Sequence, residues 1–321
     1  MGTGAQLGLV EETTFGTYVS PTRFFEFVSE SLSLDISRIE SQGWRANQRV
    51  LRTGRWRSGR KLVSGEISLE LQNKSMGLLF KHSLGAIATS TPGGGTLTRD
   101  HDATLGNLKG KSFTIQVGRD SRDASSTVRP FSYLGCKIRT WSLACQLNQF
   151  AMLNLGIIAQ DESTAQSLAS ASYATGIELF TFVEGSLTIA AASTPVRAAS
   201  ISGDNGLPDD DFALGSALMR EPLEPALRSI TGELDADFTD LTAYNRFITG
   251  TEATLVLTFT GSLIEGALNY QVIVTANVRF DGTTPTVSDV QEIRQPLAYK
   301  VIAPAAGEPI TIRYRTTDTT P

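Results

Sequence analysis

Residues 268–280, LNYQVIVTANVRF, carry the pattern that recurs along most of this chain. Every second residue from Leu268 to Phe280 is apolar, and most of those between them are polar. Alternation with a period of two is typical of a β-strand that buries one face. The same pattern, rich in Thr, Val, Ile and Phe, occurs in SLSLDIS (31–37), SGEISLEL (64–71), SFTIQVG (112–118), GCKIRTWSLACQL (135–147, with an apolar continuation through Ile158), GSLTIAA (185–191), TGELDADF (231–238) and ATLVLTFTG (253–261). The sequence therefore predicts a mainly β fold.

Only two short segments favour a helix. Residues 73–85 and 240–250 each place apolar side chains at helical spacing and end at a glycine, Gly85 and Gly250. Each follows a strand that begins with Gly-Glu, and long alternating strands follow each one. A repeated order of elements is the sequence signature of duplication. We therefore expect two tandem modules, residues 1–165 and 166–321, each with one short flanking helix. The Ser/Ala-rich stretch 161–176 is the predicted linker.

Each module contains a long polar loop, and the two loops differ in charge. The acidic loop of the second module lies around residues 204–211 and carries Asp204, Asp209, Asp210 and Asp211. The first module has a basic loop, 38–61, with Trp44 and Trp56 among its basic residues, which are Arg38, Arg45, Arg49, Arg52, Arg55, Arg57, Arg60 and Lys61.

The basic loop has three interpretations. It could contact nucleic acid through arginine and stacked Trp, it could be a solvated loop, or it could be an arm that docks on the acidic surface of a neighbouring copy. The two Trp residues favour the arm, because Trp and Arg are enriched where protein interfaces gain most of their binding energy.

Composition excludes several classes of protein. Charged residues make up 19% and hydrophobic residues 40%, which argues against wholesale disorder and against a membrane bundle. No stretch approaches the roughly 20 apolar residues that a membrane helix needs. The net charge of −5 argues against a protein that coats nucleic acid. With two Cys and two His, a zinc site is not expected, and Cys136 and Cys145 are predicted to be buried thiols.

No catalytic constellation emerges from the sequence. There is no G-x-S-x-G, no G-x-x-x-x-G-K-[ST] and no H-E-x-x-H. His82 falls near the end of the first predicted helix, where a cation would suit the helix dipole. His101, between Asp100 and Asp102, is predicted to lie in a solvated turn. We therefore expect neither an enzyme nor a bound cofactor or metal.

Several motifs, in order along the chain, resemble those of phage tail tube proteins. The first is GLVEETTFGT (8–17), which is similar to the family's G-x-x-x-E-T-x-x-G-T opening. The others are FFEF (24–27), the loop around Glu40-Ser41, the SGEI strand (64–67), Leu84-Gly85 at a helix end, the turn SGDNGL (202–207), and LTFTG (257–261) before the strand to Phe280. Residues 88–130 have no counterpart in this resemblance.

The resemblance implies a fold and a function. Tail tube proteins of long-tailed, siphovirus-type phages are β-sandwich modules whose strands close an inner β-barrel in a ring. The rings stack into a hollow, electronegative tube for DNA. Loops and the N-terminal segment, here Glu11, Thr13, Phe15 and Gly16, make contacts between subunits. If this chain holds two modules, three copies complete a ring; otherwise six are needed.

The resemblance also implies partners and a location. The partners are further copies of the chain, tail terminator and baseplate or distal tail proteins, and, transiently in the lumen, the tape measure protein and DNA. The location is the virion tail, assembled in the cytoplasm of the host bacterium. The alternative from another class is a host- or carbohydrate-binding β-sandwich of a tail fibre or adhesin.

Overall fold

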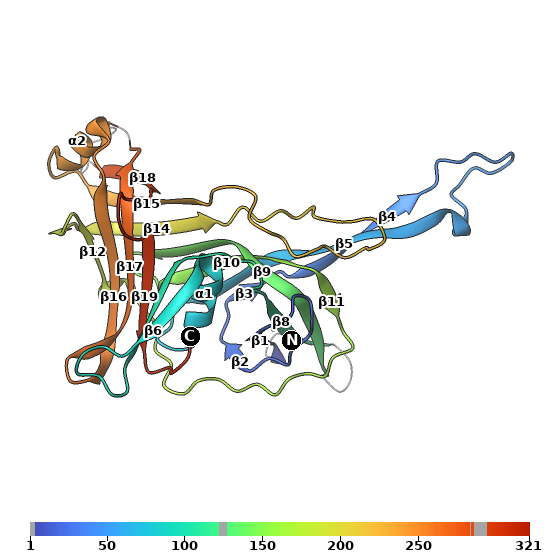
Figure 1. Ribbon diagram of the computed structural model, residues 1–321, viewed down its shortest axis with the longest axis horizontal. Coiled ribbons are helices and arrows are strands. Elements are labelled where there is room, and N and C mark those ends of the chain that lie inside the picture. The colour runs from blue at the N-terminus through green and yellow to red at the C-terminus, as the bar shows by residue number, and fades with distance from the viewer. Residues whose placement is uncertain (1–3, 122–126, 283, 286–293) are drawn as a thin grey trace.

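A computed structural model describes residues 4–121, 127–282, 284–285 and 294–321. The fold is mainly β, as the alternating segments predict, and its strands form one hydrogen-bonded network. The central sheet runs along the long axis of the molecule (Figure 1). Its strands, in spatial order, are β4 (Ser33–Glu40), β5 (Trp56–Glu70), β10 (Met152–Ala159), β9 (Val128–Gln146), β14 (Val196–Asp204), β15 (Ser229–Asp237) and β18 (Arg294–Val301).

A second group of strands, the end sheet, stands across one end of the central sheet (Figure 1). It is joined to the central sheet where β17 pairs with β18. Its order is β13 (Ala192–Ser193), β12 (Gly185–Ile189), β16 (Ala253–Glu265), β17 (Leu268–Phe280), β19 (Ile310–Thr316), β7 (Arg99–Leu105) and β6 (Gly85–Ser90).

The first half of β9 belongs to a third, smaller sheet. Its other strands are β2 (Arg23–Phe25), β1 (Gln6–Glu11), β8 (Phe113–Asp120) and β11 (Asp161–Ser163). The short β3 (Ser29–Glu30) pairs with β5, and single turns of 3-10 helix occupy Thr53–Arg55 and Phe182–Glu184. Within one subunit the described strands do not close into a barrel, since β4 pairs only with β5.

The main hydrophobic core lies between the sheets. It takes side chains from both halves of the sequence, from Leu7 in β1 to Tyr314 in β19. Strand pairing also joins the halves, because β9 pairs with β14 and β7 pairs with β19. Gly203 in β14 faces Trp141 in β9 so closely that a Cβ there would lie 2.4 Å from the indole. The division into modules at residues 165 and 166 stays a prediction.

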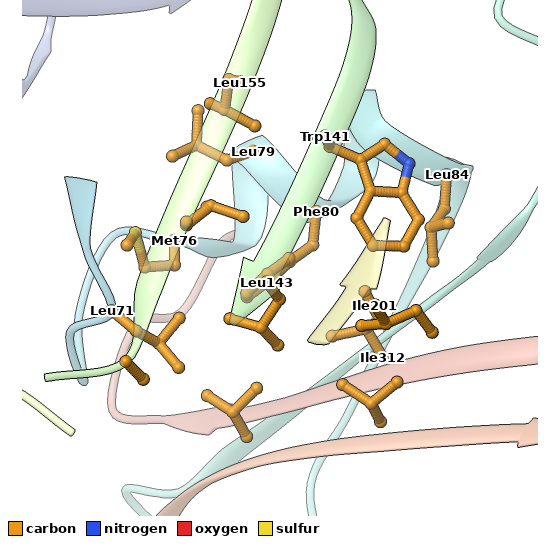
Figure 2. Close-up of a cluster of buried hydrophobic side chains, with 14 of the residues drawn as sticks. Leu71, Met76, Leu79, Phe80, Leu84, Trp141, Leu143, Leu155, Ile201 and Ile312 are labelled. Atoms are coloured by element: carbon orange, nitrogen blue, oxygen red, sulfur yellow. The ribbon is translucent and has the colours of Figure 1, made fainter. Parts of the chain in front are cut away.

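The two predicted helices are present but pack differently. α1 (Gly77–Leu84) lies beneath β9 and β10 with its apolar side chains buried (Figure 2). It ends at Gly85, whose φ of 104° and close approach to the Gly106 carbonyl exclude a side chain. α2 (Thr242–Thr249) has no buried residue, and its flanking Leu241 and its Ile248 are 57% and 62% exposed. One helix is part of the core, whereas the other sits on the surface.

Both cysteines are buried and unbonded, as predicted. Cys136 lies in the main core, and Cys145, near the end of β9, is 9% exposed. Burial raises the pKa of both thiols above the ordinary value.

The prediction for His101 was wrong. The residue is fully buried in β7 rather than in a solvated turn. Its Nε2 lies 2.9 Å from the carbonyl of Asp318, which can only accept, so Nε2 carries the proton. Nδ1 then accepts from the Thr89 hydroxyl at 2.8 Å. The imidazole is a satisfied core group.

The carboxylates beside His101 can lie in a strand because two arginines of β19 pair with them. Asp100 receives two hydrogen bonds from Arg315, at 2.7 and 2.9 Å, and Asp102 receives two from Arg313 at the same distances. Forked pairs of this kind neutralise carboxylates that would otherwise keep the segment in water. Because the arginines lie far away in the sequence, local pattern could not reveal them.

His82 has the expected structural role but not the expected charge. It is 1% exposed and packs edge-on against Phe113 at 4.9 Å. Burial, together with the charges of Lys81, Lys137 and Lys111, lowers the pKa of His82 from 6.5 to about 3. The nearest carboxylate is Glu11, at 3.6 Å. The side chain is therefore neutral at pH 7 and does not serve as a cation on the helix dipole.

The lowered pKa of His82 predicts acid sensitivity. His82 binds a proton near pH 6.5 in the unfolded chain but only near pH 3 in the folded chain. The stability that depends on neutral His82 is therefore fully present above pH 6.5 and is lost as the pH falls from 6.5 to 3. A tenfold difference in proton affinity between the folded and unfolded chain is worth about 1.4 kcal/mol, so the loss of stability reaches several kcal/mol. Urea unfolding at pH 7.5 and pH 4 should show a larger loss for wild type than for His82→Phe. Equal losses for wild type and His82→Phe would contradict the lowered pKa of His82.

Candidate subunit interface

The predicted basic loop is a hairpin arm that projects beyond the body (Figure 1). We call residues 38–61 the arm. The expectation of an irregular loop across this range was wrong at both ends, because Arg38, Ile39 and Glu40 of β4 pair with Ser58, Arg57 and Trp56 of β5. Pairing satisfies the peptide groups of a segment that has no core to pack against. The turn spans residues 41–55.

The arm exposes large apolar side chains to solvent. Trp44, at the turn, is 98% exposed, Val50 is 74% exposed and Leu51 is 45% exposed. Trp56, at the start of β5, is 42% exposed and lies under the Arg38 guanidinium, which is 5.5 Å from the ring centre. A fully exposed Trp is unusual in a monomer and typical of a surface that another molecule covers.

The arginines of the arm form no ion pair within the described residues. Arg57 donates to the backbone carbonyls of Gly54 and Trp56, and Arg38 donates to those of Ile36 and Ser37. The others at the turn are exposed or half-buried, namely Arg45, Arg49, Arg52 and Arg55. The arm therefore carries a strong net positive charge.

The base of the arm is fastened to the body. Lys61 forms an ion pair with Asp161 at 2.9 Å. Residues 205–228, which we call the strap, run beside β5, and Lys61 N–H donates to the Ala217 carbonyl. The Arg60 guanidinium lies 5.8 Å from the ring centre of Phe212. The base of the arm and the strap are therefore one structural unit.

Lys137, which the sequence did not single out, anchors the strap. It is 2% exposed, and its Nζ donates to Glu221 at 2.6 Å and to the carbonyls of Leu108 and Pro222. Burial lowers the pKa of Lys137, while Glu221 opposes the shift. Leu108 also packs with three more buried residues, Ile158, Leu207 and Met219. A lysine in an alternating strand gives no local sign of such a role.

The predicted acidic loop begins with Asp204, the last residue of β14, and continues into the start of the strap; three of its aspartates are already engaged. Asp204 accepts from Gly206 N–H at 2.8 Å, Asp209 pairs with Arg139 at 2.8 Å, and Asp211 pairs with Arg220. Asp210 is exposed. Docking of a neighbour's arm on this loop stays a prediction.

The predicted N-terminal contact residues lie against the body. Glu11, in β1, binds Lys81 at 2.6 Å, and the Phe15 ring lies against Gly135. Gly16 has a φ of 73°, and a Cβ there would collide with Gln160. Thr13 is exposed. Their role between subunits stays a prediction.

The residue that organises this segment is Glu12, next to those predicted. It is 4% exposed and accepts from Ser112 Oγ, Thr114 Oγ1 and the N–H groups of Gly135 and Gly16. Glu12 is the Glu of the opening motif G-x-x-x-E-T-x-x-G-T, and its place directly before Thr13 was the sign in the sequence that could have indicated this role.

The solvent side of the central sheet forms a continuous polar face. Cross-strand neighbours place Ser68, Asn154, Ser142, Ser202, Thr231 and Lys300 in one row. Ser68 donates to Asn154 at 2.8 Å. A parallel row holds Glu70, Met152, Ala144, Ser200, Glu233 and Ala298, and a third begins Glu66, Gly156, Thr140 and Asp204. Small side chains and carboxylates predominate on this face.

The described residues hold no group of three or more His, Cys, Asp or Glu side chains placed to bind a metal ion. None of the described helices is long and apolar enough to cross a membrane.

Tryptophan fluorescence can test the exposure of the arm. The chain has three Trp residues, and Trp141 is 2% exposed where Trp44 is 98% exposed. We expect Trp44→Phe to remove the component that acrylamide quenches most strongly and that emits at longest wavelength. The matched change Trp141→Phe should remove the protected component. Equal quenching of both variants would place Trp44 in a folded contact.

Comparison with known proteins identifies the family. A family model described as phage tail tube protein matches residues 2–301. A search of curated proteins found no match to this chain. The family match spans nearly the whole chain and confirms the resemblance of its motifs, so the chain belongs to the phage tail tube protein family.

Proposed function

We propose that this subunit polymerises as stacked rings into the hollow tail tube through which phage DNA passes. Family membership makes the chain a structural component of the phage tail. The observation that carries the proposal is the arm, which extends beyond the body of the subunit and holds exposed Trp and arginines that form no ion pair with the described residues. Such a surface is costly to leave in water and suits an interface between copies. The family does not favour a host- or carbohydrate-binding role.

The basic arm supplies long-range attraction between copies. Opposite charges on two surfaces raise the rate of encounter and fix their register. The acidic loop lies at the base of its own arm, where a laterally adjacent copy in the ring could bring its own basic residues against Asp210. If the two halves are modules, three copies complete the ring. Tail terminator, distal tail and tape measure proteins are the proposed further partners.

The polar face of the central sheet is the proposed lining of the channel. It spans strands of both halves and carries Glu66, Glu70, Asp204 and Glu233 against Lys300. Carboxylates repel DNA phosphates, and small side chains leave the channel wide. DNA would therefore pass without sticking to the wall.

Reversal of the arm's charge tests polymerisation. We expect the triple variant Arg52→Glu, Arg55→Glu, Arg57→Glu to abolish tubes in negative-stain images while circular dichroism shows a folded subunit. The control keeps the charge, with Lys at the same three positions, and should still form tubes. Normal tubes from the Glu variant would refute the role of the arm. Wild-type protein that stays monomeric at high concentration would refute the proposed function.

Charge reversal on the polar face tests the channel lining. Tubes of Glu66→Lys, Glu233→Lys should form and retain short fluorescent DNA at low salt, whereas wild-type tubes should not. The control Glu26→Lys changes an exposed carboxylate between β2 and β3, outside that face. Equal DNA retention by the two variants would show that another face lines the channel.

A further inference from the structure

The end of the subunit opposite the arm contains a cavity whose wall is partly apolar. Figure 1 places the arm at one extreme of the long axis and β12, with the start of β14, near the other. The cavity has a volume of about 270 Å³ and opens between the end of β9, β12, β14 and the 3-10 turn Phe182–Glu184. Its wall combines the apolar side chains of Leu187, Leu257 and Phe259 with the polar ones of Gln146, Ser193 and Arg197. This volume lies below the usual range for small-molecule sites and suits one large side chain.

Exposed apolar side chains lie at the cavity and beside it. Leu147, which lines it, is 48% exposed. Val183, in the adjoining turn, is 75% exposed, and Phe150, bridged to Thr181, is 43% exposed. Adjacent apolar groups around a cavity are the features of a docking site for an aromatic anchor.

The charges of the two ends are opposite. The arm contains seven arginines and one lysine against the single Glu40. At the other end, residues 181–197 and 237–252 contain four carboxylates against Arg197 and Arg246. The two segments adjoin, since Asp237 pairs with Arg197 at 3.2 Å. Complementary charge therefore favours approach of the arm to this end.

We propose that Trp44 of one copy enters this cavity in the next copy along the tube. The inference rests on the proposed function, since stacking repeats the subunit along one direction. Two complementary patches at opposite ends of a subunit make a head-to-tail contact that does not close on itself, and such contacts build filaments.

Cys145, on the wall of the cavity, is a native reporter of this contact. A cysteine introduced beside Trp44 by Gly43→Cys should form a disulfide with Cys145 of the next copy when assembled tubes are oxidised. Non-reducing gels should then show a ladder of covalent oligomers. Cys145→Ser in the same background should remove the ladder, and Ser58→Cys, nearer the base of the arm, should not produce it.

A substitution at Trp44 supplies the second measurement. Trp44→Ala should raise the concentration needed for tube formation at least tenfold and leave the melting temperature of the subunit unchanged, because the side chain is 98% exposed. Trp56→Ala is the matched control and should have a smaller effect. If wild type forms tubes but no ladder depends on Cys145, or Trp44→Ala assembles like wild type, the inference fails and the tube function stands. If wild type forms no tubes, both fail.

Discussion

The pairing of β9 with β14 is the interaction on which the rest of this structure depends. It joins strands from the two halves of the sequence into one sheet and aligns Leu143 with Ile201 on the core side and Ser142 with Ser202 on the solvent side. Because side chains alternate across a sheet, one register sets both faces at once, and a slip by one residue would exchange them. The contact of Gly203 with Trp141 fixes that register, since a larger residue would not fit against the indole.

The polar face follows from this register, and the arm follows from the length of β5. The core holds the part of β5 that begins at Val63. The residues of β5 before Val63 extend the hairpin away from the body, and none of them is buried. Edge strands such as β4 expose unpaired backbone groups, which natural proteins protect with charge. The arginines of the arm supply that charge, so the residues that protect this edge from indiscriminate strand pairing are the same ones that the proposed docking on a surface of opposite charge would use.

Several elements with a strong local pattern were predicted from the sequence, although β19, which also alternates, was not. Residues 268–280 coincide with β17, and both helices lie within their predicted segments. β18 was not predicted, because Pro296 interrupts a pattern that otherwise alternates. The positions of His101 and Lys137 depended on Arg315 and Glu221, which lie far along the chain, and no local pattern contains such information. The arm's composition was evident, but its hairpin was not, because without a buried face the strands carry no apolar alternation.

The two helices differ in how much apolar surface they leave exposed. α1 has its hydrophobic stripe in the core, whereas α2 leaves Leu241 and Ile248 in solvent. Folding could not bury every apolar group at both ends of so long a subunit, because the core lies between the sheets and the ends project from it. In the head-to-tail stack that we propose, one contact would cover apolar groups at both ends of the subunit and would repeat at every interface. Each contact could then be weak alone, because a subunit in such a stack would be held by several at once.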